Sequence, residues 1–330
     1  METKENILLS IKDLHVWYRA YGGYLKVLNG VDLIVREGER VGLVGEAGCG
    51  KTTTMKSILQ ILPPRNFLIP KGEIYYKRKD ILKMNFSEIQ RLRSKEIAMI
   101  FQDPTAALNP VFTLGTQIGD VIRYSIALDR GKVRKEKIRA LSVKALKEVS
   151  LPDPERMLVN YPFQLSGGMR QRVCIAMAIS SSRNLLIADE PGTSLDVTIQ
   201  DQILRLLKEI VEKKGTSIIL ITHSLGVARE MTDRIYVMYA GTIVETALTK
   251  DLFKNPVHPY TKGLLASVPK LSGGGLAKGI PGRIPDYLNP PQGCRFQPRC
   301  EYATPSCVET PPQLFEVEKG HLVACYLAQR

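Results

Sequence analysis

Short, continuous runs of hydrophobic residues recur along the chain. One contains Val41, Leu43 and Val44; it follows a turn at Glu37–Gly38 and leads into a glycine-rich loop. Two more occupy residues 184–189 (NLLIAD) and 217–223 (SIILITH). Runs of this kind are typical of parallel strands that are covered on both faces. The pattern therefore predicts buried strands at these three places.

A helical pattern lies between the second and the third of these runs. The segment SLDVTIQDQILRLLKEIVEKKG is expected to form a helix that stops at Gly215. Strand, helix and strand at this spacing predict a right-handed crossover connection and a layered α/β core.

Residues 115–150 have a different pattern. Ile138, Leu141, Ala145 and Val149 recur at three- and four-residue steps, which places them on one face of an amphipathic helix. We therefore expect a mainly helical insert here.

After about residue 250 the chain becomes rich in proline and glycine, as in IPGRIPDYLNPPQG and ETPPQL. This composition predicts loops and short elements. A tail of this kind needs a staple to be compact.

Composition limits the class of protein. With 330 residues, 44% of them hydrophobic and 24% charged, the chain has the makeup of a soluble globular protein with more than one lobe. No hydrophobic run reaches the ~18 residues that a membrane-spanning helix needs, and the first residues lack the pattern of a secretory signal. We expect a cytosolic protein unless it docks on another component. The net charge of +13 is compatible with nucleic acid, an anionic membrane face or phosphate ligands, and also with solvated basic faces.

The strongest local motif follows the first hydrophobic run. Residues 45–52 read GEAGCGKT and fit the phosphate-binding pattern G-x-x-x-x-G-K-[ST]. Glycines let backbone N–H groups converge on phosphate oxygens, and the N-terminus of the following helix adds partial positive charge. Lys51 is expected to reach the terminal phosphates, and Thr52 to ligate Mg²⁺. The predicted nucleotide-binding residues are Gly45, Glu46, Ala47, Gly48, Cys49, Gly50, Lys51, Thr52 and Thr53.

Two acidic residues end the second hydrophobic run. Asp189 and Glu190 lie at the carboxyl end of a predicted strand, where ligands bind in such sheets. Asp189 is positioned to hold Mg²⁺, and Glu190 to polarise a water molecule as a general base. Alone, the pair would be two exposed acids at the end of a strand; beside a phosphate loop it predicts nucleotide hydrolysis.

The segment LSGGMRQR, residues 165–172, places Ser166, Gly167 and Gly168 at the start of a predicted helix. At the start of a helix, unpaired backbone N–H groups can bind an anion, and small residues let it approach them. With this segment, residues 7–250 resemble an ATP-binding cassette (ABC) ATPase, in which Ser-Gly-Gly is the signature motif. The resemblance implies that these three residues contact the γ-phosphate of a nucleotide on the opposite protomer.

The other motifs of the resembled family occur in order. Gln102 in FQDP matches the Q-loop residue, which senses Mg²⁺ and water and lies near the permease contact. Asp196 in TSLD matches the D-loop, and His223 matches the switch histidine, which would contact the γ-phosphate and hold the attacking water. Tyr18 in LHVWY matches the aromatic residue that stacks on adenine, with Trp17 as a rival for that role.

Two positions depart from the family pattern. Gly192 stands where Thr or Ser is usual, and Cys49 stands where Ser is common in the phosphate loop. Neither change removes a required group. Cys49 and Cys174 are expected to be small apolar fillers.

The resemblance also implies a mechanism. One chain carries both the phosphate loop and the signature, but the two serve different nucleotides, so two cassettes must close head-to-tail with ATP between them. Hydrolysis by Glu190 and water then opens the pair. Catalysis here comes mostly from positioning and charge neutralisation.

Further stretches resemble one subfamily, the oligopeptide/dipeptide/nickel importers, and most closely their ATPase subunit lettered D. These are FQDPTAALNPVFTLGTQI, NPVHPYTKGLL and IPGRIPDYLNPPQGCRFQPRC. The resemblance implies a motor for uptake of dipeptides or oligopeptides, or else of nickel or another small solute. It implies a second related ATPase, two membrane permease subunits and an extracytoplasmic binding protein as partners, and a place on the cytoplasmic face of the membrane. A soluble ABC ATPase acting on nucleic acid is the rival class; against it, the chain has one phosphate loop and no platform of basic and aromatic residues.

The expected fold is therefore α/β, with an ABC-type P-loop NTPase core. The predicted parts are an N-terminal antiparallel β subdomain and the first part of the core (1–102), a helical subdomain with the signature (103–175), the second part of the core (176–250), and an irregular, cysteine-containing C-terminal extension (251–330).

Four cysteines lie in this extension: Cys294, Cys300, Cys307 and Cys325. An ATPase that uses cytosolic ATP works where thiols are kept reduced, so a disulfide framework is not expected. Structural zinc usually has at least one short C-x2–4-C pair, which is missing, and four thiolates also suit a [4Fe–4S] cluster. Some members of the resembled family hold such a cluster, so we expect a structural [4Fe–4S] site here, with zinc and unmetallated thiols as alternatives.

Overall fold

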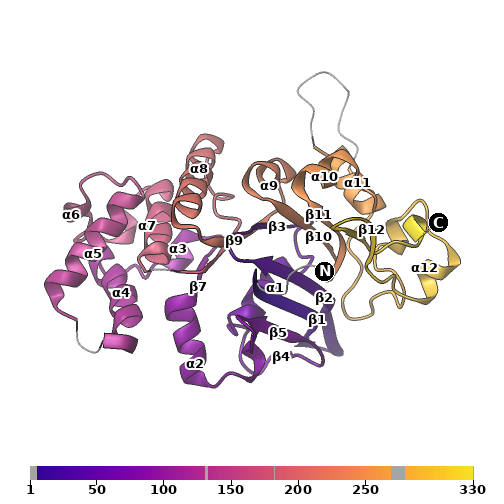
Figure 1. Ribbon diagram of the computed structural model, residues 1–330, viewed down its shortest axis with the longest axis horizontal. Helices are drawn as coiled ribbons and strands as arrows, with labels where there is room; N and C mark the ends of the chain where they lie inside the picture. The colour runs from indigo at the N-terminus through magenta and orange to yellow at the C-terminus, as the bar shows by residue number, and fades with distance from the viewer. Residues whose placement is uncertain (1–5, 131–132, 182, 269–278, 330) are drawn as a thin grey trace. The chain divides into compact units, whose positions relative to one another are not determined.

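The computed structural model describes residues 6–130, 133–181, 183–268 and 279–329. The chain divides into two compact units (Figure 1). The first comprises Met1–Lys83 and Leu220–Arg330, and the second comprises Met84–Ile219. The division falls within strand β9 (Ser217–Thr222), the third of the predicted strands, whose six residues are all buried.

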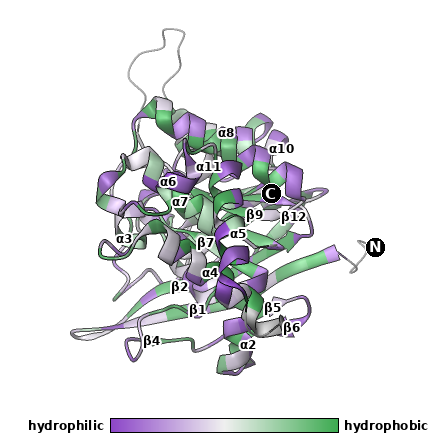
Figure 2. Ribbon diagram, turned by 90° about the vertical axis from the view of Figure 1, so that its left-hand side faces the viewer, coloured by the Kyte–Doolittle hydropathy of each residue, from purple (hydrophilic) through white to green (hydrophobic). Residues whose placement is uncertain are grey.

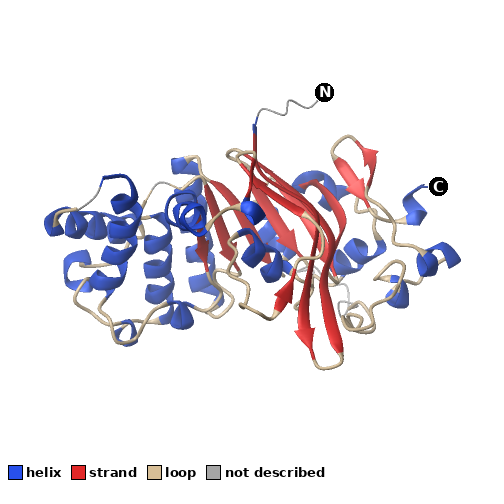
Figure 3. Cartoon of the chain, turned by 90° about the horizontal axis from the view of Figure 1, so that it is seen from below, coloured by secondary structure: helices blue, strands red, loops and turns tan. Residues whose placement is uncertain are grey.

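The first unit contains an antiparallel sheet of five strands in the order β2-β1-β5-β6, with β4 also paired to β1. Two long strands, among those drawn red in Figure 3, form its central hairpin, and Gly22 provides the left-handed turn residue with φ 86°. The strands are β1 (Ile7–Ala20), β2 (Gly23–Arg36), β4 (Phe67–Leu68), β5 (Glu73–Tyr76) and β6 (Lys79–Asp80).

A second sheet in the first unit has the strand order β12-β13-β11-β10-β3. Strands β3 and β10 are parallel and the other neighbours are antiparallel. Val41, Leu43 and Val44 are buried in β3, as the hydrophobic pattern predicts. The strands are β3 (Arg40–Val44), β10 (Arg234–Tyr239), β11 (Thr242–Leu248), β12 (Phe315–Glu318) and β13 (His321–Val323).

Short helices complete the first unit. They are α1 (Lys51–Ile58), α9 (Leu225–Met231), α10 (Thr249–Lys254), α11 (Pro259–Ala266) and α12 (Pro305–Glu309), with 3-10 turns at Ile81–Lys83, Gln297–Arg299 and Tyr326–Gln329. The proline-rich tail thus has the short elements that its composition predicts. It also supplies β12 and β13: β13 pairs with β11, β12 pairs with β13, and together they extend the sheet that holds β3 (Figure 1). The sequence pattern did not predict this pairing.

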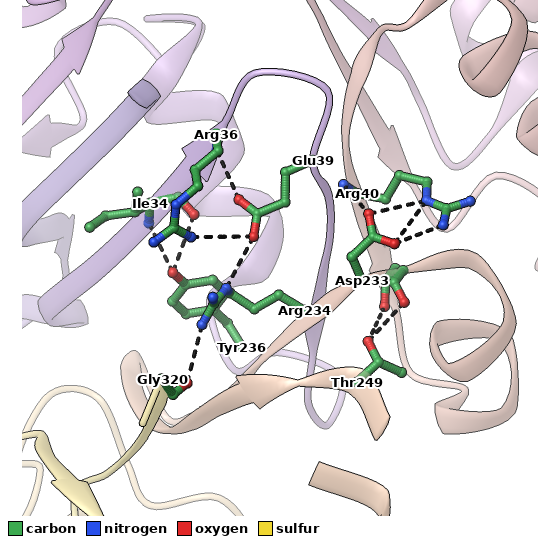
Figure 4. Close-up of polar contacts among 10 residues, drawn as sticks. Ile34, Arg36, Glu39, Arg40, Asp233, Arg234, Tyr236, Thr249 and Gly320 are labelled. Atoms are coloured by element: carbon green, nitrogen blue, oxygen red, sulfur yellow. Dashed lines mark hydrogen bonds and ion pairs between the residues drawn. The ribbon is translucent and has the colours of Figure 1, made fainter. Parts of the chain in front are cut away.

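A polar network joins the tail to this sheet (Figure 4). The Arg234 guanidinium pairs with the Glu39 carboxylate at 3.1 Å and donates to the Gly320 carbonyl at 3.2 Å. The same carboxylate accepts from the Arg36 N–H at 2.8 Å. The side chains of Arg234 and Glu39 are each 11% exposed, so solvent screens their ion pair little. The network therefore fixes the β12–β13 turn against the start of β10.

The second unit is mainly helical around the parallel pair of strands β7 (Ile97–Ile100) and β8 (Leu185–Asp189). The predicted strand at 184–189 is β8, and all its residues are buried. The helices are α2 (Phe86–Arg91), a π-helical turn at Leu92–Glu96, α3 (Pro104–Ala107), α4 (Leu114–Arg130), α5 (Lys135–Glu148), α6 (Pro154–Met157), a 3-10 turn at Pro162–Gln164, α7 (Gly167–Ile179) and α8 (Val197–Lys214).

Helix α8 ends where the sequence predicts. Gly215 follows its last residue with φ 62°, and its N–H bonds the Glu212 carbonyl, which closes the helix. One face of α8 carries the buried residues Ile203, Leu204, Leu206, Leu207, Ile210 and Val211. Figure 2 shows both hydrophobic and hydrophilic segments on this helix, as expected for one that covers a core on one side.

The expected face of α5 needs a correction. Ile138, Ala145 and Val149 are buried, but Leu141 is only half-buried, and Leu146 is fully buried instead. Ser142 takes the remaining core position because its hydroxyl donates to the Ile138 carbonyl at 2.9 Å, which satisfies the buried oxygen. The buried face is thus rotated slightly from the predicted one.

Within the described residues, none of the helices combines the length and the apolar character that crossing a membrane requires.

Candidate functional site

The glycine loop lies between β3 and α1, in the first unit, and its glycines are required by the backbone. Gly48 and Gly50 have φ values of 79° and 109°, in the left-handed region that side chains disfavour. Gly45 is constrained differently: a Cβ atom there would lie 2.1 Å from the Met238 carbonyl oxygen of β10. The loop is therefore a tight backbone cradle at the start of a helix, the arrangement that binds phosphate groups.

Lys51 supplies a buried positive charge at this cradle. Its side chain is 5% exposed, and its ammonium donates to the carbonyl oxygens of Gly45 at 2.7 Å and Glu46 at 2.9 Å. Thr52 and Thr53 follow in the first turn of α1 and are half-buried. A buried cation held by carbonyl dipoles provides a strong attraction for an incoming anion.

The structure distinguishes the two aromatic candidates on β1. Successive side chains point to opposite faces of a strand. The Tyr18 hydroxyl donates to the Thr53 hydroxyl at 3.4 Å, so Tyr18 lies beside the start of α1. Trp17 lies with Tyr24, at 6.2 Å between ring centroids, and with the Lys26 ammonium at 5.6 Å. Tyr18 is the one of the two that faces the loop.

In the second unit, two predicted acids lie at the end of β8, and one of them contacts a third predicted residue. Asp189 is buried at 4% exposure, and the next residue, Glu190, has a left-handed φ of 46°. Such strain in a non-glycine residue persists only where surrounding contacts hold it. The Gln102 amide donates to the Glu190 carboxylate at 3.2 Å.

A residue that the sequence reasoning missed completes this group. The Thr193 hydroxyl donates to the same Glu190 oxygen at 3.1 Å. Its only sequence signal is its place three residues after the acid, in the turn PGTS. Together, Gln102 and Thr193 orient the carboxylate as a proton acceptor requires.

The predicted signature residues begin helix α7. Ser166 is its N-cap, and its hydroxyl accepts from the Met169 N–H at 3.3 Å. A Cβ atom on Gly168 would lie 2.7 Å from the Ile199 side chain, at the start of α8. Glycine here therefore permits close packing of α7 on α8. Asp196, the exposed residue that precedes α8, lies in the same stretch as Ile199.

His223 follows β9 directly and is exposed. The next residue, Ser224, caps helix α9 by accepting from the Val227 N–H at 3.4 Å. The predicted residues are thus divided: Tyr18, the glycine loop and His223 belong to the first unit, whereas Gln102, the signature residues, Asp189, Glu190 and Asp196 belong to the second.

All six cysteines are free thiols. Cys49 and Cys174 are buried, as expected for apolar fillers, and burial raises the pKa of Cys174 to about 12. Thiolates are the reactive and metal-binding form, so this shift keeps Cys174 inert.

The four cysteines of the extension lie close enough to interact electrostatically. Burial raises the pKa of Cys294 to about 11, and Cys307 and Cys325 add in the same direction. Burial also raises the pKa values of Cys300 and Cys325. The Cys294 N–H donates to the Cys307 carbonyl at 2.8 Å. Across the described part of the chain, however, no three His, Cys, Asp or Glu side chains are arranged to hold a metal ion.

A glycine cradle with a buried lysine at the start of a helix defines the class of nucleotide-hydrolysing P-loop proteins. Comparison with known proteins gives the family. Residues 28–193 match the family described as ABC transporter, and residues 244–307 match the family described as oligopeptide/dipeptide transporter, C-terminal region. The chain belongs to the ABC transporter family and is an ATPase of that family, with a mixed α/β cassette fold and an antiparallel β subdomain.

Relatives match over nearly the whole chain. The dipeptide transport ATP-binding protein DppD of Bacillus subtilis (strain 168) is 44% identical over 321 residues, covering 97% of this chain and 94% of that protein. The oligopeptide transport ATP-binding protein OppD of the same organism is 44% identical over 322 residues, covering 97% and 88%. Among solved structures, the ATP-binding cassette MJ0796, bound to ADP and Pi, has a TM-score of 0.64 at 27% identity, covering 73% of this chain and 98% of that one.

Proposed function

We propose that this chain is the ATP-hydrolysing motor subunit of an importer for dipeptides or oligopeptides. The observation that carries the proposal is the glycine cradle with Lys51 buried behind it, in a chain whose relatives over nearly its whole length are named peptide transport ATP-binding proteins. Nickel or another small solute is the alternative cargo. The C-terminal match to the oligopeptide/dipeptide transporter region favours peptides.

The individual roles follow from the chemistry of each side chain. Lys51 and the backbone of Gly45–Thr53 bind the phosphates, and Tyr18 stacks on the adenine. Glu190, oriented by Gln102 and Thr193, accepts a proton from the attacking water, and His223 holds that water against the γ-phosphate. Mg²⁺, when bound, neutralises charge on the phosphate oxygens. Its proposed ligands are Thr52, Gln102 and Asp189, whose oxygen atoms are of the kind that Mg²⁺ prefers.

We propose that the motor works as a head-to-tail pair with a second, homologous ATPase subunit. Ser166, Gly167, Gly168 and Asp196 would contact the nucleotide held by that partner. The similar cassette MJ0796 is described as dimeric, which supports the proposal. The pair would dock on two membrane permease subunits at the cytoplasmic face of the membrane, with an extracytoplasmic binding protein delivering the cargo. The net charge of +13 suits a protein held near an anionic leaflet.

We also propose that the extension cysteines bind a [4Fe–4S] cluster with a purely structural role. Four thiols are the donor set that such a cluster takes. Cys294, Cys300 and Cys325 each interact electrostatically with Cys307. Zinc is the less favoured occupant because the four cysteines include no short C-x2–4-C pair. Burial disfavours the charged thiolate form of these cysteines. The positive charge of the iron ions in a cluster would favour that form.

Replacement of the general base tests the motor assignment. Glu190→Gln keeps the shape of the side chain but cannot accept a proton, so it should bind Mg–ATP and accumulate a closed dimer with little turnover. Glu209→Gln, an exposed acid on α8, is the matched control and should hydrolyse ATP normally. Undiminished turnover by Glu190→Gln would overturn the assignment.

Cargo is tested by co-purification. The permease pair that is isolated with this chain is placed in vesicles together with it. ATP hydrolysis by this assembly should be stimulated by a binding protein loaded with peptide rather than with nickel. Stimulation by nickel alone would select the alternative, and salt-sensitive binding of the isolated chain to DNA or RNA would favour a nucleic-acid enzyme.

The cluster proposal is tested by metal analysis after strictly anaerobic purification. We expect about four iron and four sulfide per chain, and loss of both in Cys300→Ser. A colourless, iron-free protein, or one with stoichiometric zinc, would contradict it.

A further inference from the structure

Three residues of the C-terminal extension contact the phosphate loop directly. The Tyr260 hydroxyl accepts a hydrogen bond from the Glu46 N–H at 3.0 Å. The Tyr287 hydroxyl donates to the Gly48 carbonyl at 2.8 Å. The Arg299 guanidinium pairs with the Glu46 carboxylate at 2.9 Å. The loop is thus held by the extension as well as by the strand and helix that flank it.

Tyr260 is itself held rigidly. It is fully buried, and its ring centroid lies 4.7 Å from that of Tyr239 and 5.4 Å from that of Phe296. Burial raises the pKa of Tyr260 and of Tyr287, so both hydroxyls stay protonated at neutral pH. Both therefore act as neutral hydrogen-bonding groups on the loop backbone.

Arg299 is fixed from several directions. It donates to the carbonyl oxygens of Pro281 at 2.8 Å and Ile280 at 3.1 Å, and its guanidinium lies over the Tyr239 ring at 5.6 Å. Its side chain is 5% exposed, whereas that of Glu46 is 29% exposed. An arginine held in this way keeps its charge beside Glu46 without losing further freedom when the pair forms.

The charge of Glu46 gives this pairing a consequence for ligand binding. Glu46 is an acid within a loop whose proposed ligand is a polyanion. An unpaired carboxylate there would repel the phosphates, and low exposure on the arginine side would limit screening. The hydrogen bonds at the Glu46 N–H and the Gly48 carbonyl also fix the backbone on both sides of Ala47. A preformed loop loses less entropy when it binds phosphate.

We infer that Tyr260, Tyr287 and Arg299 are positioning residues for ATP: they hold residues 46–48 in the phosphate-binding conformation and neutralise Glu46. The inference rests on the proposed binding of ATP by the glycine loop. It makes the C-terminal extension part of the nucleotide site, so that affinity for ATP depends on how the extension is folded. The chain then needs its extension for ATP affinity.

The sharpest test is to remove the charge of Arg299 alone and then together with that of Glu46. The full chain is used, with a fluorescent ATP analogue and Mg²⁺ as the probe. Arg299→Gln should weaken binding roughly fivefold to tenfold, because it leaves Glu46 unpaired. The double variant Arg299→Gln/Glu46→Gln should recover most of this loss, because no charge then needs neutralising. In steady-state turnover the KM for ATP should rise in Arg299→Gln while kcat changes less than about twofold.

Arg283→Gln, an exposed arginine of the same extension, is the matched control and should bind like the wild type. If Arg299→Gln fails to fold, Tyr287→Phe tests the backbone contact alone, and it should raise the dissociation constant about twofold to fivefold. Wild-type affinity in Arg299→Gln or in Tyr287→Phe would overturn the inference, as would a loss in Arg299→Gln that the double variant does not recover. Failure of the wild-type chain to bind the probe would instead overturn the proposed function.

Discussion

The Gln102 amide donates a hydrogen bond to the Glu190 carboxylate at 3.2 Å, across 88 positions of sequence. Glu190 has left-handed backbone geometry, with φ 46°. The contact therefore orients a strained acid at the end of β8. Thr193 provides a second donor to the same oxygen at 3.1 Å.

Removal of this donor should slow hydrolysis more than it weakens binding. Gln102→Ala should lower kcat about tenfold, because a proton acceptor that is no longer oriented is less effective. Thr193→Val should have a smaller effect, and the double variant should be worse than either. Steady-state ATPase assays beside nucleotide-binding measurements check this. Equal losses in kcat and in affinity would show that Gln102 acts on binding instead.

The glycine loop predicts a contrast between two substitutions. A Cβ atom at position 45 would lie 2.1 Å from the Met238 carbonyl oxygen, which is backbone and cannot move easily. At Gly48 nothing lies within 4 Å, and only the φ of 79° opposes a side chain. Gly45→Ala should lower the free energy of unfolding by about 3 kcal/mol or more, and Gly48→Ala by about 1 kcal/mol. Urea unfolding compares the two, and similar losses would contradict the prediction.

Substitution of Glu245 should cause a large loss of stability. This buried carboxylate accepts from the Val257 and His258 N–H groups at 2.8 and 3.0 Å and pairs with the His321 ring at 2.8 Å. Glu245→Ala would leave these buried groups unsatisfied and should cost about 3 kcal/mol. Glu245→Gln keeps an acceptor and should cost less.

Urea unfolding, with the exposed Glu301→Ala as the control, measures the Glu245 effect. Equal stability of Glu245→Ala and the control would show that this polar group is not needed to join the extension to β11.

Because of His258, the free energy of unfolding should depend on pH. Burial lowers its pKa from 6.5 to about 3, with Lys262 adding in the same direction. Below pH 6.5 the unfolded chain therefore binds a proton that the folded chain does not, so the free energy of unfolding falls as the pH falls from 6.5 towards 3. The limiting slope for this group is about 1.4 kcal/mol per pH unit.

His258→Asn should make this decline shallower. The His258 ring caps helix α11 by accepting from the Tyr260 N–H at 3.0 Å, and an asparagine side chain can replace that cap. Glu245 and His321 also lie near this position, and both are present in the variant, so the difference between the two proteins isolates His258. Identical decline in urea midpoints between pH 7 and pH 5 would contradict the assignment.

The features that the sequence predicted correctly are local ones. Gly215 ends α8 because a single glycine supplies the left-handed residue that closes a helix, whatever lies elsewhere in the chain. The burial of Val41, Leu43 and Val44 likewise follows from their hydrophobicity in a short run. The sequence predicted the buried face of α5 less well. Leu141 and Leu146 are equally hydrophobic, and only packing against neighbouring helices decides which of them is buried.

The sequence by itself determined the three buried strands, the end of α8, the phosphate loop and the family resemblance, since each depends on residues that are close together in the chain. Only the tertiary structure decided that Tyr18 rather than Trp17 faces α1, that β12 and β13 extend the sheet of β3, and that Arg299 pairs with Glu46. The last contact joins residues 253 positions apart. No periodicity or spacing encodes such a pair, because it forms only when the chain brings the extension back against the loop.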